Sequence, residues 1–383
     1  MRVRLLERID DIEATQWDSL VGTDNPFLKH AFLSALEGTG CVAESEGWLP
    51  QHLVLLDERG ALAGAMPLYL KEHSWGEFVF DWAWADAYQR AGLAYYPKLV
   101  SAIPYTPATG SRLLTADTTD RGAVRTHLIR ATLDLARELN VSSCHVLFPQ
   151  EDELALLRDH GFLARKDCQF HWRRGSNEDF EGFLGGFSSK KRKNVRRERR
   201  RIAELGIEFE TLKGGEIDPC LWDTIYHLHA STFAMRGRRP YLTRRFFETI
   251  DRTMPEHLMI KVARHHDRAV GAAIFFEGAQ ALYGRYWGCA VDIHSLHFET
   301  CYYQGIDYCL ENGLDLFEPG TQGEHKISRG FTPATTWSAH WLANPHFSRA
   351  IEDFLVREQG HVESYMTAVD EHSPFRAGLQ QHE

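Results

Sequence analysis

The stretch "HLMIKVARHHDRAVGAAIFFEGAQALYGRYWGCAVD", residues 257–292, decides the fold of this chain. It contains an apolar strand, a polar turn, a long apolar strand that carries Gly271, and the aromatic strand "YGRYWG". Residues 52–88 have the same order, with Gly64 in the place of Gly271 and "FDWAW" in the place of the aromatic strand, which ends near Trp84. Two copies of one αβ unit explain this order better than two unrelated domains.

Each copy is followed by a helical pattern and then by another strand. Residues 121–138 carry apolar side chains at helical spacing before the strand "CHVLF", and residues 296–310 do so before Gly313 and the strand "LDLFE". An antiparallel meander followed by a helix and a returning strand is the order of the acetyltransferase (GNAT) fold. We therefore predict an α/β fold of the α+β type, with two tandem acetyltransferase-like domains, each a mostly antiparallel sheet flanked by helices.

The length of 383 residues is that of two domains with ordinary cores. We expect an N-terminal domain over residues 1–174 and a C-terminal domain over residues 175–383, with the boundary near Gly175. No low-complexity linker marks this join.

The composition indicates a soluble protein without a membrane span. Hydrophobic residues make up 43% of the chain, and no apolar run approaches the roughly 20 residues that cross a bilayer. The first residues, "MRVRLLERIDDIEATQW", lack the apolar core of a signal peptide, so we expect a cytoplasmic location. The seven cysteines form no CxxC pair, and we expect free, mostly buried thiols.

The stretch "SSKKRKNVRRERRRI", residues 188–202, is strongly basic in a chain whose formal net charge is -10. Its cations begin in the first helical turn, where the helix dipole disfavours them, and its single acid, Glu198, cannot offset the like-charged pairs four residues apart. A helix selected for stability alone would mix acids with bases. We therefore interpret it as an anion-binding surface rather than a solvated face, with four candidate ligand-binding residues: Lys190, Lys191, Arg192 and Arg196.

A second basic stretch, "MRGRRPYLTRRFF", covers residues 235–247 and has five arginines and no acid. If it lay beside the first basic helix, the two would form one positive cleft. Such a cleft suits a ligand with several phosphates, for example a nucleotide-linked sugar, coenzyme A or an RNA acceptor stem.

The run "FEPGTQGEHKISRGFTP", residues 317–333, follows a predicted strand and combines flexible backbone with charge. Sites of α/β proteins tend to lie at the carboxyl ends of strands, so we favour a functional role over a solvated loop. Acyl transfer to an amine needs a proton acceptor and a group that stabilises the oxyanion. Lys326 is the candidate for the oxyanion or donor carbonyl, Glu324 or His325 for the base, and Arg329 for a substrate phosphate or carboxylate.

The segment from Arg285 to Ala290 fits the R-x-x-G-x-A pattern that binds pyrophosphate in acetyltransferases. The next predicted helix begins only near Leu296, so a strand-end turn packed by Tyr286 and Trp287 is the competing interpretation.

Tryptophans 82, 84 and 287 are candidates for a pocket lining, although core packing is the more common role of tryptophan.

Other classes of site lack their motifs. No H-E-x-x-H or comparable spacing is present, and we predict no structural or catalytic metal. No G-x-S-x-G accompanies a serine, which argues against a hydrolase triad.

With these residues in view, the chain resembles the FemAB-like branch of the acetyltransferase superfamily, a bacterial group described as peptidoglycan biosynthesis or recognition proteins. The resemblance covers nearly the whole chain and rests on five segments: "SKKRKNVRRER" (189–199), "YGRYWG" (283–288), "LHFETCYYQGIDYCLENGL" (296–314), "GTQGEHKISRGFTP" (320–333) and "SAHW" (338–341).

The resemblance implies a chemistry as well as a fold. Fem relatives move an amino acid from aminoacyl-tRNA onto the peptide of a cell-wall precursor. In them a basic residue near the start of a helix like 189–205 meets the precursor's diphosphate, and a lysine near the end of the sheet assists transfer. By position these residues are similar to Lys190–Arg192 and to Lys326.

We therefore expect an acyltransferase that forms an amide bond on an amine acceptor, with acyl-CoA or aminoacyl-tRNA as donor. We expect no tightly bound cofactor, acyl-CoA being at most a co-substrate, and the expected partners are a phosphorylated small molecule and tRNA. The alternative is a non-catalytic module that recognises a cell-wall precursor or RNA. The sequence does not fix the oligomeric state.

Overall fold

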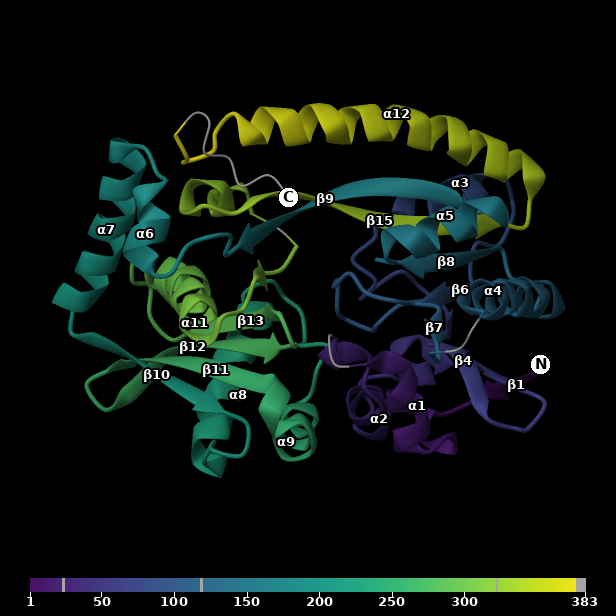
Figure 1. Ribbon diagram of the computed structural model, residues 1–383, viewed down its shortest axis with the longest axis horizontal. Helices are drawn as coiled ribbons and strands as arrows, with labels where there is room; N and C mark the ends of the chain where they lie inside the picture. Colours follow the sequence, from purple (N-terminus) through teal and green to yellow (C-terminus); the bar gives the residue numbers. More distant parts are fainter. Residues whose placement is uncertain (23–24, 118–119, 322, 377–383) are drawn as a thin grey trace. The chain divides into compact units, whose positions relative to one another are not determined.

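The chain forms two compact units, and neither is one continuous segment. The computed structural model describes residues 1–22, 25–117, 120–321 and 323–376 (Figure 1). The first unit consists of Met1–Asp167 with Thr335–Ser364, and the second consists of Cys168–Ala334 and the residues from Tyr365 on.

This division differs from the single boundary expected near Gly175. Strand β15 (Thr332–Leu342) pairs with β8 (Ser143–Leu147) in antiparallel register, which returns residues after Ala334 to the first unit. Sequence order alone does not show such a return, because the partner strands lie far apart in the chain.

The first unit contains two small sheets with helices around them. Its elements are β1 (Arg2–Leu6), η1 (Ile9–Asp11), α1 (Ala14–Val21), η2 (Pro26–Leu28), α2 (His30–Gly38), η3 (Glu44–Glu46), β2 (Trp48–Pro50), β3 (His52–Leu56), β4 (Leu62–Met66), β5 (Tyr69–Lys71), α3 (Trp82–Arg90), β6 (Lys98–Ser101), β7 (Leu114–Thr115), α4 (Arg121–Glu138), β8 and α5 (Glu151–Asp159). Strand β9 (Leu163–Arg173) begins in this unit, and helix α12 (Pro345–Asp370) lies mostly within it.

One sheet of this unit has the strand order β1-β3-β4-β7 and is antiparallel. The other runs β2-β5-β6-β8-β15, and within it β6 and β8 are parallel, with Val100 opposite His145. The expected hairpin in residues 52–66 is confirmed as β3 and β4. Helix α4 is confirmed over residues 121–138, and it begins where the Asp120 carboxylate accepts a hydrogen bond from the Ala123 amide at 2.8 Å.

The aromatic strand expected to end near Trp84 is wrong, because these residues form helix α3. Trp82 and Trp84 alternate as they would in a strand, but Ala83 stands between them and Ala85 and Ala87 follow, and alanine favours a helix. The buried residues of α3 are Trp84 and Tyr88, which are four positions apart and therefore lie on one helical face.

The second unit contains the remaining elements. They are α6 (Phe180–Gly185), α7 (Ser189–Glu204), β10 (Ile207–Lys213), α8 (Pro219–Ala234), α9 (Arg244–Thr253), η4 (Pro255–His257), β11 (Leu258–His265), β12 (Arg268–Glu277), β13 (Ala281–Cys289), α10 (Leu296–Phe298), the π-helical segment η5 (Glu299–Tyr303), α11 (Gln304–Asn312), β14 (Leu316–Glu318) and the 3₁₀ helix η6 (Glu324–Arg329).

The sheet of the second unit has the order β10-β11-β12-β13-β14, and β9 pairs with β14. The meander predicted for residues 257–292 is confirmed as β11, β12 and β13, which are antiparallel, whereas β13 and β14 are parallel. The helical stretch from Leu296 ends at Gly313, as expected, with Gly313 in a left-handed conformation at φ 69°. Two acetyltransferase-like domains in tandem therefore describe the fold.

Helices cover both faces of the second sheet (Figure 1). Helix α7 contacts β10 and η5, and its Val195 packs in the same apolar cluster as Phe275 and Tyr303. Helix α8 contacts β12 and β13 on the other face, where its His229 ring lies 4.8 Å from the Tyr286 ring. The two faces carry different chemistry, because α7 holds the first basic stretch, whereas the second runs from the end of α8 into the first turn of α9.

Candidate active site

Strands β13 and β14 run side by side for three residues and then separate. Their parallel register pairs Tyr283 with Glu318, after which β14 ends and β13 continues to Cys289. After β14, a Cβ atom at Gly320 would lie 3.6 Å from the Gly284 carbonyl oxygen of β13, and residues 324–329 form η6. The predicted loop therefore lies where the sheet opens, at the carboxyl end of β14.

Lys326 is the buried cation of this loop, with 1% of its surface exposed. Its Nζ donates a hydrogen bond to the Gly320 carbonyl at 2.5 Å. Burial first and the positive charge of Arg285 second lower the pKa of Lys326 to about 7, while the Cys301 thiol acts in the opposite direction. Near neutral pH this amine therefore exists in both its neutral and its charged form.

Arg285 lies below the surface rather than at a pyrophosphate-binding turn. Its side chain is 4% exposed, its guanidinium is 4.0 Å from the Glu318 carboxylate, and it lies over the Tyr283 ring at 5.4 Å. Burial lowers the pKa of Arg285, and Glu318 opposes this shift. The side chain thus belongs to the charged cluster around Lys326.

The glycine of the R-x-x-G-x-A pattern has a packing role. A Cβ atom at Gly288 would lie 1.8 Å from the Leu228 carbonyl oxygen of α8, so only glycine lets helix and strand approach this closely. Trp287 packs over Gly271 and lies 5.6 Å from the His297 ring. The next helix begins at Leu296, as the sequence indicated, and the Ser295 hydroxyl pairs with His294 rather than capping that helix.

The two base candidates have different partners, and within the described residues neither forms a hydrogen bond with Lys326. Side chains two positions apart in a 3₁₀ helix lie on different sides, which separates Glu324 from Lys326. Glu324 is exposed and accepts a hydrogen bond from the Tyr365 hydroxyl at 3.1 Å. His325 Nε2 lies 2.8 Å from the Tyr302 hydroxyl, and its pKa is lowered by burial and then by Arg329 and Lys326.

Arg329 is an internal residue that joins η6 to the basic helix. Its guanidinium is 2.8 Å from the Glu198 carboxylate of α7 and lies over the Phe298 ring at 3.3 Å. The Tyr303 hydroxyl donates a second hydrogen bond to Glu198, at 2.5 Å. Because the Arg329 guanidinium is buried and already paired with Glu198, Arg329 stabilises the fold here and does not form an open phosphate-binding site.

This ion pair predicts a stability effect. Replacing Glu198 by alanine leaves the Arg329 guanidinium buried without its carboxylate, and we expect a loss of about 2–3 kcal/mol of unfolding free energy, measured by urea denaturation. The control is Glu204→Ala, which removes an exposed acid of the same helix. Equal stability of the two variants would contradict the assignment.

Helix α7 combines one apolar face with a wide basic surface. Val195 and Ile202 are buried, Arg199 forms an ion pair with Asp307 at 2.6 Å, and Arg196 forms one with Glu181. Acids outside the helix therefore stabilise it. Across the part of the chain that the structure describes, seven cations of α7 form no ion pair: Lys190, Lys191, Arg192, Lys193, Arg197, Arg200 and Arg201.

Part of this basic surface borders η6. Lys191 stands seven residues before Glu198, two helical turns away, and so lies on the face that contacts Arg329. The second basic stretch does not join it, because α9 lies with α8 on the opposite face of the sheet (Figure 1). The single positive cleft considered for the two stretches is therefore not formed.

Two further groups near Lys326 were not predicted. Glu318 ends β14 and supplies the nearest carboxylate to Arg285. His171 of β9 is buried, and its pKa is lowered to about 3 by burial first and then by Arg173, Lys326 and Arg285. Glu318 can be recognised in the sequence as an acid at the end of a predicted strand. His171 has no such local pattern, because β9 lies beside β14 only in the folded sheet.

The first unit has the same kind of parallel pair, β6 and β8, and a buried arginine is bonded to the end of β8. The guanidinium of Arg112 donates to the carbonyls of Leu147, Gly110 and Ala108 at 2.8–2.9 Å. Glu153 accepts hydrogen bonds from the amides of Arg112 and Leu113. The second unit therefore offers the better candidate site.

Two kinds of feature have no candidate among the described residues. Within residues 1–22, 25–117, 120–321 and 323–376, no group of three or more His, Cys, Asp or Glu side chains is placed to hold a metal ion. Within the same residues, no helix has the length and apolarity needed to span a bilayer.

A family model described as peptidoglycan biosynthesis/recognition, FemAB-like, matches residues 8–377. The chain belongs to the FemAB-like family. This confirms the resemblance drawn from the basic helix and the loop around Lys326. No sequence among the curated proteins matches the chain.

Solved structures share the fold of this FemAB-like protein at low sequence identity. The C-terminal domain of a protein described as a lysylphosphatidylglycerol synthetase from Agrobacterium fabrum is 12% identical, with a TM-score of 0.55 over 90% of this chain and 96% of that one. L-PGS from Bacillus licheniformis is 11% identical, with a TM-score of 0.53 over 88% and 98%. FemX is 12% identical, with a TM-score of 0.53 over 92% and 100%.

Proposed function

We propose that this FemAB-like protein is a cytoplasmic acyl- or aminoacyltransferase that forms an amide bond on an amine acceptor. The observation that carries the proposal is the buried amine of Lys326, held at the point where β13 and β14 separate and with a pKa of about 7. Groups that transfer protons work best when their pKa lies near the working pH.

In the proposed reaction, the acceptor nitrogen attacks the donor carbonyl carbon and forms the new C–N bond. The bond from that carbon to the donor's thioester sulfur or ester oxygen breaks, and the proton lost by the nitrogen passes to neutral Lys326 and then to the leaving group. Lys326 therefore acts as the proton carrier, which we favour over the oxyanion role expected from sequence because burial brings the pKa of this amine to about 7. His325 stays uncharged there and orients the loop through Tyr302.

We propose aminoacyl-tRNA as the donor, with acyl-CoA as the competing candidate. The supporting observation is the unpaired basic surface of α7, which borders η6 and suits a polyanion better than a single pyrophosphate. The name lysylphosphatidylglycerol synthetase, borne by a protein of similar fold, also describes aminoacyl transfer. Lys190, Lys191 and Arg192 would contact phosphates of the donor or of a phosphorylated acceptor, and Arg196 would do so on leaving its ion pair with Glu181.

The basic surface predicts salt-dependent tRNA binding. Changing Lys190, Lys191 and Arg192 together to glutamine should weaken binding by about tenfold or more at about 100 mM salt and reduce the slope of log Kd against log salt by about 2. Filter binding across a salt series measures both. The matched control changes Arg236, Arg239 and Arg245 to glutamine on the opposite face, and an equal loss in the two triple variants would refute a specific site on α7.

The function itself is tested by incubating the pure protein with an amine-bearing nucleotide-linked cell-wall precursor and either charged tRNA or acetyl-CoA. Mass spectrometry then detects the new amide, and melting curves with each compound detect binding. An amide formed from charged tRNA supports the proposal in full, and one formed only from acetyl-CoA supports the acyl-CoA alternative. Ligand-induced stabilisation with no product from either donor would instead indicate a binding module.

A further inference from the structure

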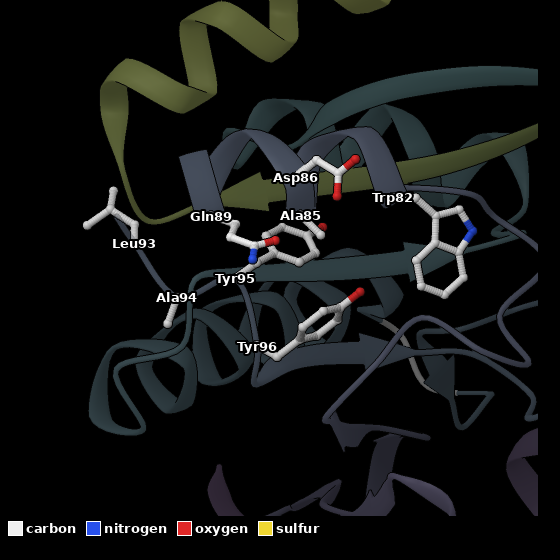
Figure 2. Close-up of a pocket in the computed structure, with 8 residues that line it drawn as sticks. All are labelled: Trp82, Ala85, Asp86, Gln89, Leu93, Ala94, Tyr95 and Tyr96. Atoms are coloured by element: carbon white, nitrogen blue, oxygen red, sulfur yellow. The ribbon is translucent and has the colours of Figure 1, made fainter. Parts of the chain in front are cut away.

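The first unit contains a pocket of about 420 Å³ that the proposed reaction does not use. One helical face of α3 forms its roof with Trp82, Ala85, Asp86 and Gln89, which recur three or four positions apart. The following segment, Leu93–Tyr96, forms the opposite wall, and Figure 2 shows the rings of Tyr95 and Tyr96 beneath the helix. Of the tryptophans considered from the sequence, Trp82 lines this pocket, whereas Trp84 is part of the core.

Both tyrosines of the wall direct their hydroxyl groups inward. The Tyr95 hydroxyl donates to the buried Asp81 carboxylate at 2.6 Å, and the Tyr96 hydroxyl is 2.8 Å from the Ser74 hydroxyl. These hydroxyls are therefore engaged in the interior, and the tyrosines offer the pocket mainly ring surface. A phenol that donates to a carboxylate has an electron-rich ring, which strengthens its attraction for cations.

A cation already contacts these rings from the inner side. The ammonium of Lys98 lies 5.4 Å from the Tyr95 ring centroid and 5.7 Å from that of Tyr96. Its charge is balanced by Glu77 and Asp81, which accept hydrogen bonds at 2.8 and 2.5 Å. Glu77 and Asp81 therefore balance the charge of Lys98, and the Asp86 carboxylate of the pocket is not needed for this.

The charges of the lining select the ligand class. Asp86 is the only charged residue among the eight that line the pocket, so an anion such as a phosphate would meet a carboxylate and no cation. A sugar ring carries several hydroxyls, but among the lining residues Asp86 and Gln89 are the polar side chains that are not hydrogen-bonded in the interior. The other sugar hydroxyls would lose their hydrogen bonds to water. An organic cation needs one carboxylate and aromatic ring surface, and the pocket supplies both.

We propose that this pocket binds an organic ammonium ion, with Asp86 as counter-charge and Trp82, Tyr95 and Tyr96 as the aromatic surface. Aromatic surface continues outside the pocket, because the Trp75 ring lies 5.0 Å from the Trp82 ring and Trp75 is 44% exposed. The site is separate from the Lys326 site and does not depend on the proposed transfer reaction.

The test is isothermal titration calorimetry of the full chain with choline, n-pentylamine, N-acetylglucosamine and 3,3-dimethyl-1-butanol, the uncharged carbon analogue of choline. We expect at least one of the two ammonium compounds to bind with a Kd of about 1 mM or lower, and the alcohol to bind at least about tenfold more weakly. Choline and pentylamine distinguish a quaternary from a primary ammonium ligand, and either result supports the site.

Variants assign the binding to this pocket. Asp86→Asn should weaken ammonium binding about tenfold, whereas Asp134→Asn, which removes an exposed acid of α4, should not change it. Tyr96→Leu should weaken binding, and Tyr96→Phe, which keeps the ring, should largely retain it.

Three results would overturn the proposal. They are equal affinity for choline and its carbon analogue, binding of N-acetylglucosamine but of neither ammonium compound, and no binding of any probe by a protein that remains folded. The melting temperature of each variant shows whether it is folded.

Discussion

Replacing Lys326 by methionine is expected to lower the rate of amide formation by about 100-fold or more, with the melting temperature nearly unchanged. Methionine keeps the length and apolar character of the side chain, so the buried volume around Gly320 stays filled while the proton carrier is lost. Substrate binding should persist, because the phosphate-binding surface proposed on α7 is intact. Steady-state kinetics with the identified donor, together with a melting curve, measures both effects.

The matched control is Lys261→Met. Lys261 is another buried lysine of the second unit whose pKa is lowered by burial, but its Nζ donates to Thr211 at 2.7 Å, away from η6. Its removal should change the rate by less than about twofold. Similar losses in both variants would show that any buried lysine of the unit is needed for structure, and would remove the support for Lys326 as a proton carrier.

The pH dependence separates the two possible roles of Lys326. If the neutral amine accepts the proton, kcat should rise with pH through a midpoint near 7, where the pKa of Lys326 lies. If the ammonium stabilises the oxyanion instead, kcat should fall through the same range. The Lys326→Met variant should lack this midpoint in either case.

Replacing Lys98 by methionine is expected to cost the first unit about 3–5 kcal/mol of unfolding free energy. Lys98 is fully buried, and its ammonium donates to the Ser74 hydroxyl and the Glu77 carboxylate at 2.8 Å and to Asp81 at 2.5 Å. Without it, the carboxylates of Glu77 and Asp81 lose the ammonium that bonds to both, which is far more costly than the loss of one hydrogen bond. Urea denaturation of the full chain measures the loss.

Lys71 provides a control of the same residue type in the same unit. It is also fully buried, but burial lowers its pKa to about 7, and its Nζ lies 3.7 Å from the Trp48 ring centroid. Since much of this amine is uncharged near neutral pH, Lys71→Met should cost less than about 1.5 kcal/mol. A loss for Lys98→Met no larger than this would contradict the proposed role of the buried ion pairs.

Glu77 gives the Lys98 prediction a pH signature. Burial raises the pKa of Glu77 to about 7, and Lys98 opposes the shift, so native Glu77 holds its proton more tightly than the unfolded chain does. The contribution of Glu77 to stability therefore falls as pH rises from about 4.5 to about 7. Removing Lys98 strengthens this effect, and the destabilisation of Lys98→Met should be larger at about pH 8 than at about pH 5.

Local patterns predicted much of the fold. The meander of β11–β13, helix α4 and the glycine stop at Gly313 follow from periodicity and local conformation, and all three were predicted. Helix α3 was missed because tryptophans two positions apart resemble a strand. The return of residues after Ala334 to the first unit was missed because β15 and β8 are distant in sequence.

The candidate site was predicted less completely than the fold. Lys326 was singled out from the sequence because a lysine among glycines after a strand has a local signal, and its catalytic role stays a prediction. Arg329 was expected to bind substrate, but its partner Glu198 lies 131 positions earlier and only the folded chain shows the pair. His171 was missed for the same reason, because β9 pairs with β14 only in the folded sheet.

The return of β15 to the first unit has a consequence for biosynthesis. Strand β8 lies between β6 and β15, so its second edge has no partner until residues 338–342 have left the ribosome. During synthesis of the second unit, the first therefore exposes a row of unpaired backbone groups, the kind of edge along which chains aggregate. A nascent chain stalled before β15 is a natural substrate for chaperones, and expressing either unit alone requires a rearranged order of its segments.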